Sequence, residues 1–123
     1  MDSFLHIDHV FLQVENIPRS IEFYEKLGFK INEKTREGDS WVSLESGDAI
    51  IDLNGNGTLG HKRQEKEVGV IHFALKVKNI DETYEELVKR GVNFPRGKVF
   101  NKRNGRWNAF FNDPDGNAIH ITT

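Results

Sequence analysis

Two histidines stand at matching places in two similar stretches of this chain. His9 lies in the stretch IDHV at residues 7–10, and His72 lies in the stretch VIHF at residues 70–73. Imidazole binds divalent metals and moves protons near neutral pH, so a histidine repeated on two strands indicates that chemistry. Cysteine is absent, which excludes a thiol nucleophile, a thiolate ligand and a disulfide. A lone strand histidine is more often a satisfied core residue, and the repeat is what favours a ligand.

The repeat around these histidines extends well beyond them. The stretch IDHVFLQVENI at residues 7–17 aligns without a gap with VIHFALKVKNI at residues 70–80. Eight identities follow at one constant spacing, and the matched residues are His9/His72, Leu12/Leu75, Val14/Val77, Asn16/Asn79, Ile17/Ile80, Glu22/Glu85, Lys26/Lys89 and Gly28/Gly91. The chain therefore consists of two copies of one structural unit.

Each copy predicts a strand followed by a helix. The first strand is expected at residues 9–14 and its counterpart at residues 71–77, both rich in β-branched and apolar residues. A helix should begin at Asn16-Ile17-Pro18, where proline suits a first turn, and end before Gly28. Its apolar positions are Ile21, Tyr24 and Leu27. The second helix is expected at residues 81–90, with Tyr84, Leu87 and Val88 facing the sheet and Gly91 ending it.

Three further strands should follow each helix. We expect them near residues 30–34, 41–45 and 49–53 in the first copy, and near 93–94, 106–112 and 117–122 in the second. The fold class is therefore α+β: two tandem βαβββ modules that form a cupped sheet with the helices outside. One domain should cover residues 1–123, with module 1 at about 5–54, an exposed polar linker at about 55–68 and module 2 at about 69–123.

Composition narrows the function classes. The formal net charge is −2, with 37% hydrophobic and 29% charged residues, so we expect no nucleic-acid partner. Local basic groups are interpreted as solvated surface; they comprise Lys62, Arg63, Lys66, Lys98, Lys102, Arg103 and Arg106. No apolar run approaches the about 18 residues that a membrane span needs, and the N-terminus does not look like a signal peptide. We expect a cytoplasmic location and no membrane partner.

Four stretches together resemble the vicinal oxygen chelate superfamily, which includes glyoxalases, bleomycin resistance proteins and extradiol dioxygenases. They are IDHV at residues 7–10, NIPRSIEFY at 16–24, LGF at 27–29 and FFNDPDGN at 110–117. The resemblance covers nearly the whole chain and is specific for the fold rather than for one reaction. It implies a small-molecule substrate and a homodimer, often with sites shared between two chains.

The resemblance also implies metal ligands on the first and last strand of each module. Carried over, these are His9 and Asp52 in module 1 and His72 and His120 in module 2. The family usually has glutamate at the last position, so His120 is a departure. Three imidazoles and one carboxylate suit a divalent metal such as zinc, nickel, iron, cobalt or manganese. His6 should point to the opposite strand face, and His61 lies in the linker, so we include neither residue among the metal ligands.

Alternation along the strands outlines the rest of the site. If His120 points inward, Ala118 and Thr122 do too, and Arg106, Asn108 and Phe110 share the inner face of the preceding strand. Trp107, Ala109 and Phe111 should then face the helix. Arg106 is a candidate for holding a carboxylate or phosphonate, or is simply solvated. Trp41 and Phe11 are candidates for an apolar wall, although strand aromatics are more often core residues.

The leading function is a metal-dependent enzyme of the glyoxalase type, a lyase or isomerase. Its metal would chelate two oxygens of a small substrate and stabilise an enolate or oxyanion, with Asp52 as the catalytic base. The missing glutamate argues against glyoxalase I itself, and the extradiol dioxygenase triad fits less well. Two alternatives stay open: a bleomycin-type binding protein without catalysis, and a fosfomycin-type thiol transferase.

Overall fold

The computed structural model describes residues 2–60 and 66–123, and it divides into two compact units, Met1–Leu59 and Gly60–Thr123. Each unit is one βαβββ module with a four-stranded mixed sheet and one helix. The predicted α+β class and the predicted two modules are therefore confirmed. His61, Lys62 and Arg63, named above as linker residues, lie outside the described residues.

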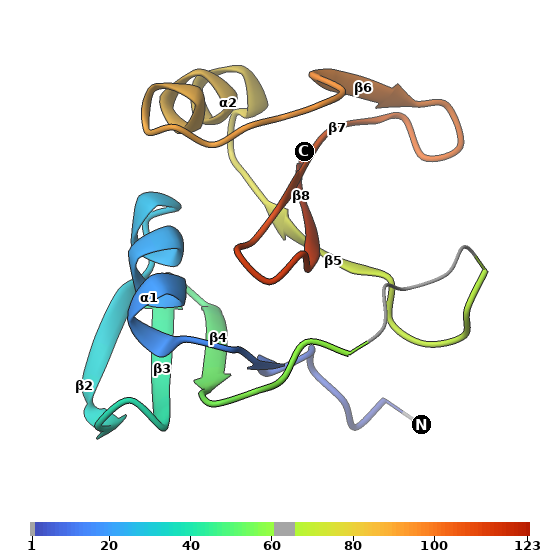
Figure 1. Cartoon of the computed structure of the whole chain (residues 1–123). Helices are drawn as coiled ribbons and strands as arrows, with labels where there is room; N and C mark the ends of the chain where they lie inside the picture. The colour runs from blue at the N-terminus through green and yellow to red at the C-terminus, as the bar shows by residue number, and fades with distance from the viewer. Residues whose placement is uncertain (1, 61–65) are drawn as a thin grey trace. The chain divides into compact units, whose positions relative to one another are not determined.

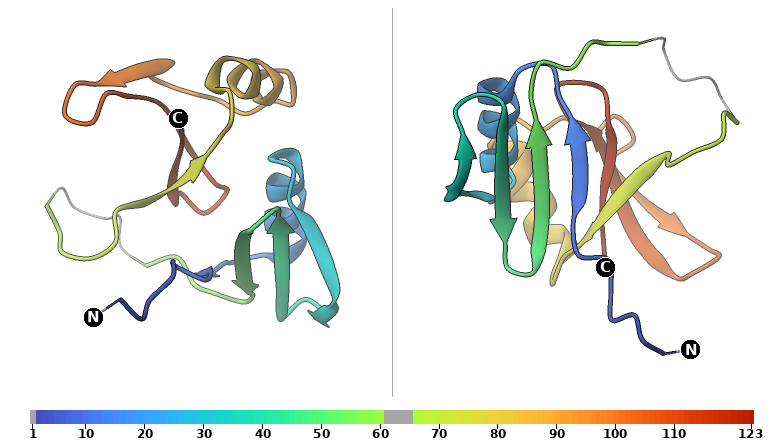
Figure 2. Two further views of the ribbon diagram at one scale, coloured as in Figure 1. Left: turned by 180° about the vertical axis from the view of Figure 1, so that it is seen from behind. Right: turned by 90° about the horizontal axis from the view of Figure 1, so that it is seen from below.

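The first unit runs through five elements. They are β1 (Val10–Gln13), α1 (Ile17–Lys26), β2 (Lys30–Glu37), β3 (Trp41–Ser46) and β4 (Ala49–Asn54). The strands lie in the order β1-β4-β3-β2, with β1 parallel to β4 and the other neighbours antiparallel. The right-hand view of Figure 2 shows these four strands side by side. The first and last strands of the module are therefore direct neighbours.

The second unit repeats this topology. Its elements are β5 (His72–Lys76), α2 (Ile80–Lys89), β6 (Lys98–Asn101), β7 (Arg106–Asn112) and β8 (Ala118–Thr122), labelled in Figure 1. The strand order is β5-β8-β7-β6, again with the first strand parallel to the last. The first and last strands are neighbours here as well, which brings their side chains onto one shared surface.

Both helices begin and end in the same way. The side chain of Asn16 accepts a hydrogen bond from the backbone N–H of Arg19 at 2.9 Å, and that of Asn79 accepts one from Glu82 at 3.1 Å. These caps satisfy backbone donors that a helix start leaves unpaired. Gly28 and Gly91 follow the helix ends with φ of 101° and 91°, a conformation that glycine adopts without strain.

One face of the first sheet packs against α1. Val42, Leu44, Ile51 and Leu53 alternate with polar residues along β3 and β4, and each is at most 1% exposed. They bury the apolar side of α1, where Ile17, Ile21 and Tyr24 lie. The second sheet has the same arrangement, with Ala109, Phe111, Ile119 and Ile121 buried beside Ile80 and Leu87. The opposite face of each sheet carries the polar residues of the alternation.

Several predicted details are wrong, and each has a physical cause. The strand expected at residues 93–94 forms instead at 98–101, because Phe94, Pro95 and Gly97 make a turn in which the Gly97 N–H donates to the carbonyl of Phe94. Val88 is 48% exposed and Trp107 is 45% exposed, so α2 covers neither side chain. The first strands are also shorter than predicted, and His9 precedes β1 rather than lying in it.

The start of the linker is held against the first unit rather than exposed. The N–H of Gly55 donates to the carbonyl of Ser40, and the N–H of Gly57 donates to that of Val14, both at 2.8 Å. The amide of Gln13 donates to the carbonyls of Asn54 and Gly55. The predicted exposed linker is therefore wrong at these two glycines. Neither helix of the described chain is long and apolar enough to cross a membrane.

Candidate functional site

Strand register assigns the side chains of the second unit to faces. His72 pairs with Ala118, and His120 pairs with both Ala74 on β5 and Phe110 on β7. Paired residues and residues two apart share a face, so His72, Phe110 and His120 lie together. Thr122 and Asn108, which pair with each other, belong to this face too. The register therefore places Asn108, Phe110, His120 and Thr122 on one shared face, as strand alternation predicted.

The two histidines of the second unit form a ring cluster with Phe110. The ring centroids of His72 and His120 are 4.6 Å apart, and those of Phe110 and His120 are also 4.6 Å apart. His120 is 9% exposed, and its Nδ1 has no hydrogen-bond partner. Burial lowers the pKa of His120 below 6.5, and the neighbouring His72 acts in the same direction. His120 is therefore neutral at pH 7 and offers a free lone pair.

In the first unit a histidine meets a carboxylate at the corresponding place. Phe11 on β1 and Ser43 on β3 both pair with Asp52 on β4, so these three side chains share a face. His9 points its Nε2 toward Asp52, with 3.6 Å between that nitrogen and Oδ2. The side chain of Asp52 is 14% exposed and that of His9 is 43% exposed. The predicted pair of first-strand and last-strand donors is therefore in contact.

A second carboxylate holds the other side of the His9 ring. Asp8 Oδ2 lies 2.8 Å from His9 Nδ1. This hydrogen bond raises the pKa of His9 above 6.5, and the charge of Asp52 acts in the same direction. A carboxylate on Nδ1 fixes the tautomer that leaves Nε2 as the ligating atom, as in many metal sites. Sequence reasoning missed Asp8, although its place beside His9 was the available signal.

The contact of His9 with Asp52 and that of His72 with His120 lie at equivalent positions of the repeat. Val10 pairs with Ile51 in the first sheet, and Phe73 pairs with Ile119 in the second, so Asp52 and His120 occupy corresponding positions on the last strands. Each unit thus presents one histidine and one second donor on the same face. Within residues 2–60 and 66–123, no three such donors gather in one cluster.

The donor types fit a divalent metal. His120 supplies a neutral imidazole with an unpartnered buried nitrogen, and burying such a nitrogen without a partner costs free energy that a ligand would recover. His9 is oriented through Asp8, and Asp52 contributes the negative charge. The second unit offers two imidazoles and the first unit one imidazole and one carboxylate, and both donor types suit zinc, nickel, iron, cobalt or manganese.

The other predicted site residues lie partly in the first unit and partly in the second. Phe11 is 53% exposed beside Asp52, and Trp41 is partly buried on the same face, where it pairs with Asn54. Asn108 is 6% exposed, and Arg106 is an exposed residue at the start of β7. His6 forms a hydrogen bond with the carbonyl of Ile7 and precedes β1, so the predicted strand face does not apply.

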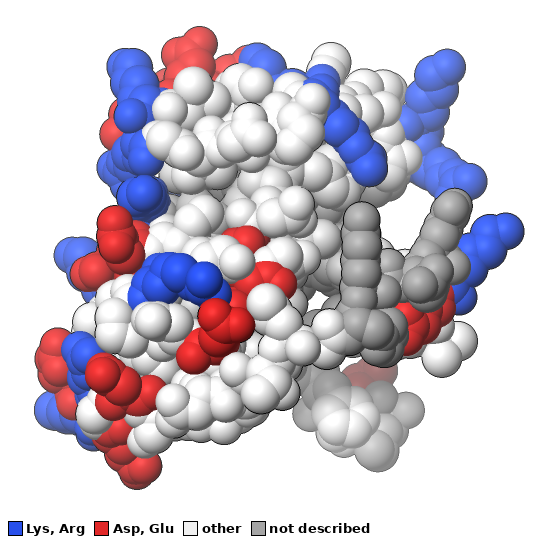
Figure 3. All heavy atoms as spheres, viewed as in Figure 1, with Lys and Arg blue, Asp and Glu red and all other residues white. Residues whose placement is uncertain are grey.

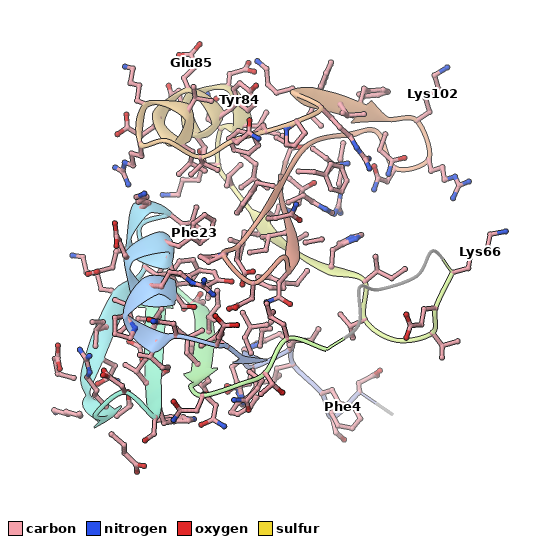
Figure 4. All side chains as sticks on the ribbon, in the orientation of Figure 1. Phe4, Phe23, Lys66, Tyr84, Glu85 and Lys102 are labelled. Atoms are coloured by element: carbon pink, nitrogen blue, oxygen red, sulfur yellow. The ribbon has the colours of Figure 1, made fainter. Side chains whose placement is uncertain are left out.

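One charged residue near the ring cluster was missed altogether. The guanidinium carbon of Arg96 lies 5.1 Å from the centroid of the Phe110 ring. Figure 4 shows the side chains of this unit, with Lys102 projecting from the hairpin between β6 and β7. Arg96 lies in the connection between α2 and β6, where no strand or helix periodicity predicts its direction.

Comparison with known proteins gives one consistent answer. Residues 6–121 match the model of the Glyoxalase/Bleomycin resistance protein/Dioxygenase superfamily. A lactoylglutathione lyase of Escherichia coli O157:H7 is 32% identical over 121 residues, covering 92% of this chain and 88% of that protein. The metallothiol transferase FosB of Bacillus licheniformis is 30% identical over 126 residues, covering 97% of this chain and 75% of that protein.

A solved structure shows the same fold over the full chain. The glyoxalase family protein from Enterococcus faecalis superimposes with a TM-score of 0.82 and 25% identity, covering 98% of each chain. This superposition covers both βαβββ units of the chain. The chain belongs to the glyoxalase/bleomycin resistance protein/dioxygenase superfamily.

Proposed function

We propose that this protein is a metal-dependent enzyme of the glyoxalase type, a lyase or isomerase that acts on a small oxygen-bearing substrate. The observation that carries the proposal is the repeated donor pair: His9 with Asp52 in one unit, and His72 with His120 in the other. We assign all four residues to one divalent metal. Relatives named lactoylglutathione lyase and metallothiol transferase support a catalytic member of the family.

Three neutral imidazoles and one carboxylate leave a divalent ion with a net charge of about +1. A metal held in this way supplies Lewis acidity toward two neighbouring oxygens of the substrate. The carboxylate usual in the family is replaced by His120, which makes the ion a stronger Lewis acid.

Asp52 is the proposed proton acceptor. It is the carboxylate of the donor set, and His9 contacts it at 3.6 Å. A proton leaving a carbon next to a carbonyl would pass to Asp52 Oδ, and the same oxygen would return it to the neighbouring carbon. Asp8 positions the His9 ring through Nδ1, and Phe11 and Phe110 offer apolar surface beside Asp52 and His120. We also propose a homodimer, which light scattering tests directly.

Metal content is the first experiment. The parent protein, a His72→Ala variant and a His6→Ala control are purified and analysed for bound metal after reconstitution. His6 forms a hydrogen bond with the neighbouring carbonyl of Ile7 and is not one of the proposed donors, so its loss should leave the metal content unchanged. We expect stoichiometric metal in the parent and in the control, and little in His72→Ala. Absence of metal from the parent would overturn the proposal and favour a binding protein of the bleomycin type.

Activity is tested next on the metal-loaded protein. Isomerisation of the adduct of a 2-oxoaldehyde with glutathione tests the glyoxalase reaction, and fosfomycin with a thiol tests the thiol transferase. The second reaction is included because the FosB relative aligns with 97% of this chain. An Asp52→Asn variant should keep its fold and lose the proton-transfer reaction. Unchanged turnover in that variant would remove Asp52 as the base.

A further inference from the structure

Three asparagines of this chain are followed directly by glycine: Asn54, Asn56 and Asn104. An asparagine in this position can react with its own backbone, because glycine has no side chain to shield the nitrogen that follows. That nitrogen loses its proton and forms a bond to Cγ of asparagine, the bond from Cγ to Nδ2 breaks, and ammonia leaves after taking up a proton. Water then opens the cyclic imide at either carbonyl and yields aspartate or isoaspartate.

The fold holds Asn54 in a geometry that opposes this reaction. Asn54 ends β4 and pairs with Gln13 of β1, and its Nδ2 donates to Gln13 Oε1 at 2.9 Å. The nitrogen that would attack belongs to Gly55, and its N–H donates to the carbonyl of Ser40 at 2.8 Å. A Cβ at Gly55 would overlap the carbonyl oxygen of Asp39, so the backbone has no room to rotate there. Both reacting groups are therefore engaged.

Asn56 is protected through the glycine that follows it. The N–H of Gly57 donates to the carbonyl of Val14 at 2.8 Å. A Cβ at Gly57 would lie 2.9 Å from Cγ of Gln13 and 3.0 Å from the carbonyl oxygen of Val14. Val14 is fully buried directly after β1. Freeing the nitrogen of Gly57 therefore requires the segment after β4 to separate from the buried end of β1, which is a costly local opening.

Asn104 lies in a more open place, the exposed turn between β6 and β7. Figure 4 shows Lys102 of this turn projecting away from the ribbon. Nothing lies within 4 Å of a Cβ added at Gly105. The Gly105 N–H donates to the carbonyl of Asn101 at 2.8 Å, but this acceptor belongs to the same short turn. Opening of the turn alone therefore frees the attacking nitrogen, without the separation of two distant segments.

The side chain of Asn104 is also folded toward the nitrogen that would attack it. Its Oδ1 accepts a hydrogen bond from the backbone N–H of Arg106 at 3.0 Å, which closes an Asx turn over the peptide of Gly105. The same donor stabilises the negative charge that develops on Oδ1 when the nitrogen adds to Cγ. Lys102, Arg103 and Arg106 surround this site in the sequence, and positive charge favours loss of the amide proton.

We propose that Asn104 is a site of spontaneous modification, which the folded protein converts to aspartate or isoaspartate, while the fold protects Asn54 and Asn56. This inference is independent of the proposed function. The product places a carboxylate among the cations of the turn. As isoaspartate it also lengthens the backbone between β6 and β7 by one methylene, directly before the strand that carries Phe110 to the ring cluster.

The test incubates the full chain at pH 8, folded and in urea, and measures conversion at each asparagine. Cleavage after lysine separates residues 103–123, which contain Asn104, from residues 35–62, which contain Asn54 and Asn56. Mass spectrometry with fragmentation assigns the position. In urea the three residues should react at similar rates. In the folded protein Asn104 should react at least about tenfold faster than the other two, a factor that corresponds to about 1.4 kcal/mol of opening free energy.

Asn104→Gln is the decisive variant, because its longer side chain moves the amide carbon away from the nitrogen of residue 105. It should accumulate no acidic species on ion exchange beyond the slow background, whereas the matched control Asn56→Gln should age as the parent does. Urea unfolding verifies that both variants fold. Two results would overturn the inference: an unreacted Asn104 in the folded protein after the urea-unfolded chain has converted, or conversion of Asn54 or Asn56 as fast as that of Asn104.

Discussion

The donors of the two units differ in the environment that each residue experiences. His120 is 9% exposed and surrounded by His72 and Phe110, whereas the side chain of His9 is 43% exposed and lies between Asp8 and Asp52. Burial disfavours the charged form of an imidazole, and a nearby carboxylate favours it. The pKa values of His9 and His120 are therefore displaced in opposite directions.

The depressed pKa of His120 predicts a loss of stability in acid. The unfolded chain takes up a proton on this residue near pH 6.5, while the folded protein resists it. The free energy of unfolding of the metal-free protein should therefore fall as the pH drops below 6.5. Urea unfolding at pH 7.5 and pH 5 measures this fall, and His120→Gln should show a smaller one. His6→Gln is the control, and equal falls in all three proteins would contradict the assignment.

The raised pKa of His9 depends on a carboxylate beside its ring, so removing the charge of Asp8 should lower this pKa. In Asp8→Asn the charged partner of Nδ1 is lost, so the pKa of His9 should move down toward its ordinary value. An NMR titration of the His9 ring proton measures this change. Asp2→Asn serves as the control because it removes a carboxylate that does not contribute to the raised pKa of His9. A pKa of His9 that stays the same in Asp8→Asn would show that Asp52 alone holds it.

The sequence predicted the four donor residues, and it did not predict Asp8 or Arg96. His9 and His72 follow from the repeat, and Asp52 and His120 were carried over from the family resemblance; strand register shows that Asp52 and His120 occupy equivalent positions. Arg96 reaches Phe110 from a connecting segment, where direction depends on the turn made by Phe94 and Gly97. No alternation rule covers such a segment, so the contact became visible only in three dimensions.

At the level of elements, the predicted helices match the structure, because the apolar periodicity and the residues at the helix ends indicate the same boundaries. Asn16 and Asn79, which the repeat pairs with each other, cap their helices with nearly identical backbone angles. The prediction failed at β6, since Phe94 is a buried anchor rather than a strand residue. Pro95 donates no ladder hydrogen bond, and Gly97 has a φ of 62°, so pairing begins only at Lys98.

The close packing around Gly55, directly after β4, predicts that one added methyl group destabilises the protein. A Cβ at Gly55 would overlap the carbonyl oxygen of Asp39 and lie 2.8 Å from Cγ1 of Ile17. Gly55→Ala should therefore lower the free energy of unfolding by about 1–3 kcal/mol, the usual cost of overpacking. Gly60→Ala is the matched control, because nothing lies within 4 Å of its added Cβ. Urea midpoints compare the two, and equal stabilities would contradict the tight packing.

At the scale of the whole molecule, charge is divided unevenly between the two units. Residues 1–59 contain eleven Asp and Glu against five Lys and Arg, whereas residues 60–123 contain eight against twelve. Figure 3 shows basic side chains projecting from the surface of the second unit. The net charge of −2 conceals this difference between the two units.

The two tryptophans provide one reporter in each unit and so test the shared donor set. Trp41 lies in β3 and Trp107 lies in β7, and the chain has no other tryptophan. In Trp107→Phe the fluorescence reports the first unit, and in Trp41→Phe it reports the second. If one metal takes donors from both units, zinc at about 100 times its Kd should stabilise each reporter's unit by up to about 2.7 kcal/mol.

The result of this experiment distinguishes one metal shared by both units from two independent metals or from no metal. A shift of the urea midpoint in both variants, abolished in both by His72→Ala, requires that a donor of the second unit stabilises the first. A shift that survives in the first unit after His72→Ala would mean that His9 and Asp52 bind metal by themselves. That result would contradict the four-residue assignment, because Asp52 would then hold its metal without the imidazoles of the second unit.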